Sequence, residues 1–91
     1  MMFTHKTAGK YSFSIEELQT EPESFLVLYH TEKDVYQIIE EAVKLFYYGK
    51  SGWMEGWPLT FVIYDARGKS IARAYVFVMS ATPTFDVILA S

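Results

Sequence analysis

The sequence contains no cysteine, only three prolines, and fewer basic than acidic side chains, eight Lys and Arg against eleven Asp and Glu. The absence of cysteine excludes a disulfide framework and a cysteine-ligated metal site. The net charge of -3 and the scattered basic residues argue against duplex nucleic acid, because phosphate contacts require a basic patch. No apolar run approaches the roughly 18–20 residues that span a bilayer, and the first residues lack the apolar stretch of a signal peptide. We therefore expect a cytoplasmic protein with no membrane partner.

Apolar side chains are abundant: 51% of the 91 residues are hydrophobic and 18% are aromatic. This composition excludes intrinsic disorder as the main state, and the length accommodates one hydrophobic core. The sequence therefore predicts a single folded domain over residues 1–91.

Two strands are predicted in the first third of the chain. Residues 11–15 alternate bulky and small polar side chains, which is the period of a half-buried strand. Residues 8–10 are expected to turn back to a further strand at 2–6. The continuous apolar run at 25–29 predicts a second strand, covered on both faces.

One helix is predicted over residues 31–48. Thr31 and Asp34 have the spacing of a helix N-cap. Apolar side chains then recur every three or four residues from Val35, which places them on one helical face. Gly49 is the expected C-terminal stop.

Three further strands are predicted at 59–64, 70–79 and 85–89, with a tight turn at Asp65–Gly68 between the first two. In the last strand, alternation directs Phe85, Val87 and Leu89 toward the core and Asp86 away from it. The order is β-β-α-β-β-β. This order predicts an α+β fold, with a mainly antiparallel sheet of four to five strands and one helix packed on one face.

The strand at 70–79 has two unlike faces. Its Ala and Val side chains suit the face beneath the helix, and its larger side chains lie on a face with no second helix. Large exposed apolar patches commonly mark interaction sites. We therefore expect binding to another protein or to a second copy of the chain as a homodimer. The candidate partner-binding residues are Tyr75, Phe77, Ile71, Arg73, Trp53 and Tyr47.

Three other arrangements would remove that surface. The sheet could curl on itself, the N-terminal segment or the loop at 49–58 could fold over it, or the two faces could be inverted. Within the loop, Trp57 is expected to cap the core, and Trp53 is the better candidate for binding.

Two other functions have some support in the sequence. Arg73, Tyr75 and Phe77 resemble the central strand of the RNA-recognition motif, in which a basic residue precedes alternating aromatics that stack on bases. The second helix of that fold has no counterpart here, so single-stranded nucleic acid is the alternative partner. A small enzyme with a pocket near His30, Asp34 and the tryptophan loop is the third hypothesis. No catalytic set, metal site or cofactor is predicted.

The C-terminal half is similar to a group of short uncharacterised bacterial proteins. The shared positions are Trp57-Pro58, Phe61, the Asp65–Gly68 turn and Pro83-Thr84-Phe85. The resemblance covers about a third of the chain, and it implies a cytoplasmic protein of bacterial, phage or plasmid origin. It implies no activity.

Overall fold

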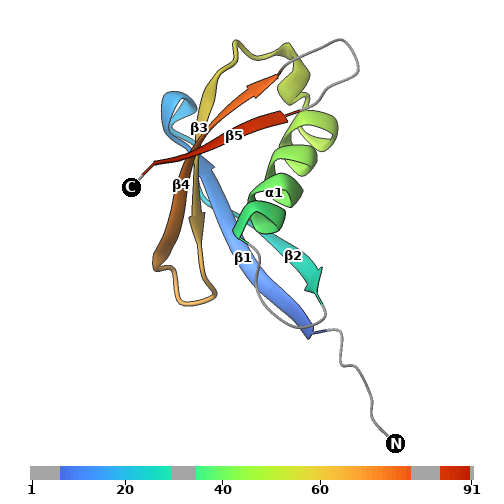
Figure 1. Cartoon of the computed structure of the whole chain (residues 1–91), viewed down its shortest axis with the longest axis vertical. Helices are drawn as coiled ribbons and strands as arrows, with labels where there is room; N and C mark the ends of the chain where they lie inside the picture. The colour runs from blue at the N-terminus through green and yellow to red at the C-terminus, as the bar shows by residue number, and fades with distance from the viewer. Residues whose placement is uncertain (1–6, 30–34, 79–84, 91) are drawn as a thin grey trace, which may run out of the picture.

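The computed structural model describes residues 7–29, 35–78 and 85–90. Within these ranges, five strands form one antiparallel sheet with one α-helix packed on one face, so the predicted α+β class is confirmed (Figure 1). The elements in chain order are β1 (Thr7–Ile15), η1 (Glu16–Leu18), β2 (Glu23–Tyr29), α1 (Val35–Gly49), η2 (Gly52–Met54), β3 (Leu59–Tyr64), β4 (Ser70–Val78) and β5 (Phe85–Ala90), where η denotes a short 3₁₀ helix.

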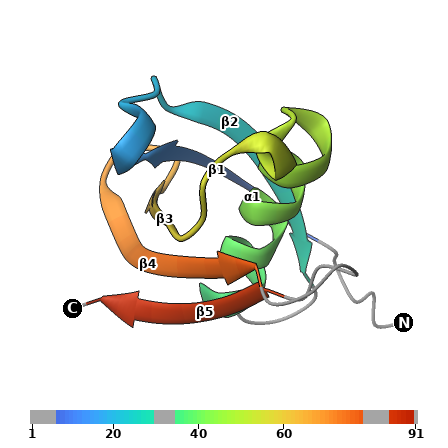
Figure 2. The same cartoon turned by 90° about the horizontal axis from the view of Figure 1, so that it is seen from above.

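The strands lie in the order β2-β1-β3-β4-β5 within the sheet. This order departs from the chain order because β3 pairs with β1 and not with β2: the chain leaves β2, forms α1 and returns to the other side of β1. The sheet bends around α1 (Figure 2). Its two edge strands are β2 and β5.

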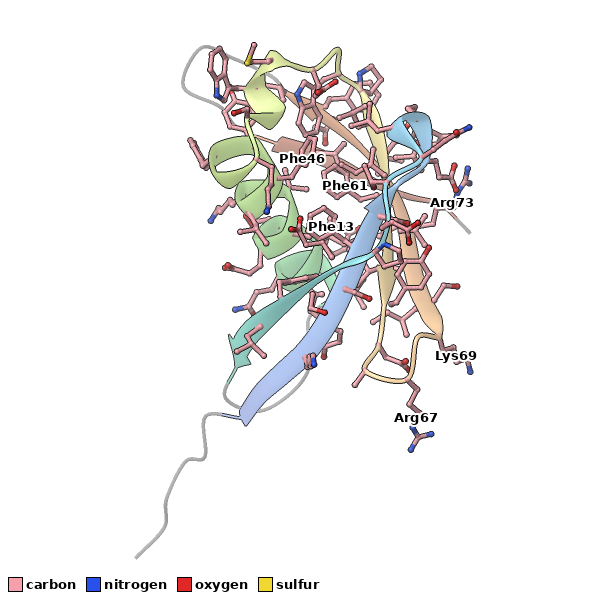
Figure 3. The ribbon with its side chains drawn as sticks, turned by 180° about the vertical axis from the view of Figure 1, so that it is seen from behind. Phe13, Phe46, Phe61, Arg67, Lys69 and Arg73 are labelled. Atoms are coloured by element: carbon pink, nitrogen blue, oxygen red, sulfur yellow. The ribbon has the colours of Figure 1, made fainter. Side chains whose placement is uncertain are left out.

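The core lies between α1 and the face of the sheet that packs against it. Phe13 of β1, Phe46 of α1 and Phe61 of β3 meet at its centre, with ring centroids 5.7–6.4 Å apart (Figure 3). The other buried apolar side chains are Tyr11, Ile15, Phe25, Val27, Ile38, Ile39, Ala42, Val43, Leu59, Ile63, Ala74 and Val76.

The buried face of α1 follows the three- and four-residue spacing that the sequence predicted. The helix ends at Gly49, and the amide of Lys50 still donates to the carbonyl of Phe46 at 3.1 Å. The left-handed residue that reverses the chain is Ser51, with φ of 59°, and not Gly49. The predicted cap residues Thr31 and Asp34 lie outside the described residues.

The turn between β3 and β4 forms as predicted. One carboxylate oxygen of Asp65 accepts hydrogen bonds from the amides of Arg67 and Lys69, at 2.9 and 3.0 Å. Gly68 has φ of 84°, a conformation that other L-residues rarely adopt. No helix among the described residues is long and apolar enough to cross a membrane.

Two details of the sequence prediction are wrong, and a third holds only in part. Residues 8–10 do not turn, because they continue β1 in register with β2. The strand at 25–29 is not covered on both faces: Leu26 is 65% exposed, since β2 is an edge strand and the helix covers only one side. Leu89 points to the core side of the sheet as predicted, in register with the buried Ala74, but it is 42% exposed, because β5 lies at the other edge of the sheet.

Candidate protein-binding surface

The face of the sheet opposite α1, here called the outer face, carries four of the predicted partner-binding residues. Ile71 and Tyr75 are 37% and 40% exposed, Arg73 is exposed and Phe77 is half-buried. The small side chains that alternate with them along β4, Ala74 and Val76, are buried in the core. The predicted orientation of this strand is therefore confirmed.

Arg73 is held in place on the outer face by Glu16 of η1. Its Nε and Nη2 atoms donate to the two carboxylate oxygens of Glu16 at 2.8 and 2.9 Å. The guanidinium carbon lies 5.8 Å from the ring centroid of Tyr75, within the range of a cation–π contact. The hydrogen bonds from Arg73 lower the pKa of Glu16, and the same bonds raise the pKa of Arg73.

The outer face is not bare over its whole width, because η1 folds over the start of β3. Thr60 has its side chain on this face and is only 1% exposed. Glu17 of η1 accepts hydrogen bonds from both the amide and the hydroxyl of Thr60. The segment that shields this part of the outer face is therefore the short helix that follows β1, which the sequence did not single out for this role.

A broad hollow of about 720 Å³ lies beside this covered part. Its wall contains a hydrogen bond of 2.9 Å between the hydroxyls of Ser14 and Tyr64. Glu16 and Arg73, which form an ion pair, are both among its lining residues, so polar and apolar side chains alternate along the hollow. The lining residues are Ser14, Glu16, Val62, Tyr64, Ser70, Ile71, Ala72 and Arg73.

The exposed apolar surface continues from β4 onto β5. Tyr75 is in register with Ile88, which is 50% exposed. Leu89 points to the other face, in register with the fully buried Ala74, and is nevertheless 42% exposed. We call Ile71, Tyr75 and Ile88 of the outer face, together with Leu89 on the opposite face of the same sheet edge, the β4–β5 surface.

Sequence reasoning missed Ile88 and Leu89. The unbroken apolar run at residues 87–90, which follows Asp86, was the available signal. An alternating strand with one covered face does not need two successive large apolar residues. The side chains of Phe85 and Val87 lie outside the described ones.

Trp53 and Tyr47 do not join the β4–β5 surface. Trp53 belongs to η2 and is 60% exposed. Tyr47 is half-buried on α1, with its ring centroid 6.1 Å from that of Trp57. The predicted binding residues therefore fall into two separate groups, one on the sheet and one at the C-terminal end of the helix.

Trp57 closes the core, as the sequence predicted. Its ring stacks on Phe61 with centroids 5.9 Å apart and contacts Phe46 edge-on. Its indole nitrogen donates to the carbonyl of Gly52 at 2.9 Å. Gly52 itself packs against Phe46 so closely that a Cβ atom there would overlap the ring and the backbone carbonyl of Phe46.

His30 and Asp34, the proposed centre of an enzyme pocket, lie outside the described residues.

No protein-family model, curated protein or solved structure matches the chain. The bacterial origin inferred from the C-terminal half therefore remains a prediction.

Proposed function

We propose that the protein is a non-enzymatic protein-binding domain that binds through the β4–β5 surface. The observation that carries the proposal is the exposure of Ile88 and Leu89, neighbouring residues on opposite faces of an edge strand. An edge strand leaves alternate backbone N–H and C=O groups without a neighbouring strand. Apolar side chains beside these groups favour pairing with another polypeptide.

Proteins commonly protect such an edge with Lys or Pro residues, with a bulge or with a covering helix. β5 carries a single charged residue, Asp86. Neither face of the strand is fully covered, because α1 leaves Leu89 partly exposed and no described element shields Ile88. Tyr75 adds an aromatic side chain of the type enriched at interface hot spots.

Single-stranded nucleic acid is the weaker candidate for the same surface. Arg73 lies against Tyr75, but it is a single cation, and the carboxylate of Glu16 lies beside it. Asp86 adds a negative charge in register with Phe77. Because a nucleic-acid backbone needs several cations to neutralise its phosphates, a single arginine beside these carboxylates favours a protein partner.

Site-specific photo-crosslinking tests the proposal, since the method captures a partner whose identity is not known in advance. Tyr75 is replaced by a benzophenone-bearing phenylalanine, and the chain is irradiated in its own cellular background. We expect a discrete adduct that contains a second polypeptide, identified by mass spectrometry.

Tyr36 is the matched control, because it is a tyrosine of similar exposure, 50%, on α1. The proposal requires an adduct at position 75 that is absent or much weaker at position 36. Equal adducts at both positions, or none at 75, would contradict it. A cross-link to an oligonucleotide would favour the nucleic-acid alternative.

A further inference from the structure

We infer that the partner of the β4–β5 surface is a second copy of this chain, paired antiparallel along β5 with Ile88 opposite Ile88 of the second copy. The inference rests on the proposed function and specifies its partner. It follows from the register of β5, from its charge and from a comparison with the other edge of the sheet.

Antiparallel pairing of two identical edge strands requires a two-fold axis perpendicular to the sheet. Such an axis keeps the outer faces of both copies on the same side. Because side chains alternate between faces along a strand, only residues that share a face can lie opposite each other. The two-fold axis must therefore pass beside one residue of β5, and the positions nearest the middle of the strand are Val87 and Ile88.

Charge distinguishes these two registers. With the axis at Val87, the carboxylate of Asp86 lies opposite Ile88 of the second copy, and no cation stands in that row. With the axis at Ile88, Asp86 lies opposite Ala90 of the second copy. Since Ala90 is in register with Arg73, this arrangement aligns each Asp86 with an Arg73 of the other copy.

Asp86 of one copy and Arg73 of the other are close enough to form an ion pair in this register. Two strand spacings separate the Asp86 and Arg73 backbones, about 10 Å, with the Ala90 backbone between them. Glu16 accepts hydrogen bonds from the Nε and Nη2 atoms of Arg73, and because a guanidinium carries five N–H donors, it can also donate to a second carboxylate. Two symmetric ion pairs would then flank the centre of the interface.

The same register completes the apolar contacts. Tyr75 and Ile88 are already cross-strand neighbours, so the centre becomes a row of Tyr75, Ile88 and their two symmetry mates on one face. Aromatic and β-branched cross-strand pairs stabilise antiparallel sheets.

The opposite edge of the sheet is less suited to self-pairing. β2 begins with Glu23, whose carboxylate forms an ion pair with Lys50 at 2.7 Å, followed by the polar Ser24. A charged start of this kind discourages another strand from pairing there. β5 has no such ion pair among the described residues.

Single-cysteine cross-linking tests the register, because the chain contains no cysteine of its own. In Ile88→Cys, the paired Cα atoms should lie about 4.5–5.5 Å apart, which is within disulfide range. We expect mild oxidation to convert most of the chains to a covalent dimer of twice the 10.5 kDa chain mass. Asp86→Cys alone should form no covalent dimer, whereas a mixture of Asp86→Cys and Ala90→Cys should cross-link.

Glu40→Cys is the control for random collision, since Glu40 is exposed on α1 and belongs to no strand of the sheet. Leu26→Cys reports pairing at the β2 edge. Sedimentation equilibrium of the unaltered chain decides the oligomeric state if a cysteine variant fails to fold, and it should show a dimer.

A monomer at high micromolar concentration, or cross-linking at Leu26→Cys in place of Ile88→Cys, would overturn the inference. Those results would leave the proposed function standing if the benzophenone at position 75 captures a different protein. Failure of both experiments would remove the inference and the proposed function together.

Discussion

Both carboxylate oxygens of Glu17 accept hydrogen bonds from Thr60: Oε1 from the amide and Oε2 from the hydroxyl, each at 2.6 Å. β1 pairs with β3 only as far as Ile15 opposite Phe61, so the amide of Thr60 lies just beyond the last strand pair. Glu17 supplies the acceptor that β1 no longer provides. One short helix thus ends the ladder, covers the outer face at Thr60 and leaves the β4–β5 surface open.

Removal of the Glu17 carboxylate should destabilise the fold. Thr60 is buried, and loss of its acceptor leaves a buried donor unsatisfied, which typically costs about 1–3 kcal/mol. We expect Glu17→Ala to lower the free energy of unfolding by about this amount, and Glu17→Gln to lower it less, because the amide oxygen retains one acceptor. Urea denaturation measures both. Glu40→Gln on the exposed side of α1 is the matched control, and an equal effect there would contradict the assignment.

The carboxylates of Glu16 and Glu17 on η1 should make the protein lose stability in acid. A variant that lacks them should lose less. Burial raises the pKa of Glu17, but the hydrogen bonds from Thr60 outweigh it, and the pKa lies below its ordinary value. The pKa of Glu16 is also lowered, chiefly by the hydrogen bonds from Arg73. A lowered folded-state pKa gives stability that is present above the unfolded-state pKa and is lost as pH falls through the folded-state value.

The pH dependence can be measured as the thermal midpoint between about pH 6 and about pH 3. The unaltered chain should lose stability over this range, and the double variant Glu16→Gln/Glu17→Gln should lose less. Parallel curves for the two proteins would show that these carboxylates carry no linked stability.

The three-ring centre of the core should tolerate truncation poorly. Phe61 is fully buried and contacts Phe13, Phe46 and Trp57. Phe61→Ala removes most of a buried ring, a change that typically costs about 3–5 kcal/mol. Leu26→Ala, at a position that is 65% exposed, should change stability by no more than about 0.5 kcal/mol. Chemical denaturation of the two variants compares them directly, and similar losses would place the core elsewhere.

Gly52 and Gly56 offer a matched pair in one loop. A Cβ at Gly52 would overlap the ring and carbonyl of Phe46, whereas a Cβ at Gly56 meets nothing within 4 Å. Gly52→Ala should therefore destabilise the fold by about 1–3 kcal/mol, the usual effect of overpacking. Gly56→Ala should be neutral or slightly stabilising. Thermal unfolding distinguishes them, and a neutral Gly52→Ala would show that the loop can move away from the helix.

The sequence predicted the parts of the fold that local patterns control. The helical spacing from Val35, the alternation in β4 and the turn at Asp65–Gly68 each act over a few residues, and the structure has all three. The pairing of β1 with β3 joins segments on either side of the helix, and no local pattern encodes it.

In the candidate surface, too, some features follow from local patterns and others from tertiary contacts. The exposure of Tyr75 follows from alternation within its own strand. The exposure of Leu89 depends on which strand ends the sheet, and the burial of Thr60 depends on where η1 folds back. Tertiary contacts set the exposure of Leu89 and the burial of Thr60. Alternation alone therefore directed Leu89 toward the core and did not indicate that η1 covers Thr60.

Amide hydrogen exchange across the two edge strands tests the use of β5 as the binding edge most directly. Outward-facing amides of an unpaired edge exchange readily, and pairing with another chain protects them. Exchange is followed at low and high protein concentration, and in the presence of any protein captured at position 75. We predict that protection rises on residues 85–90 of β5 and stays unchanged on β2. Protection that rises on β2 instead, or on neither edge under any of these conditions, would contradict binding through β5.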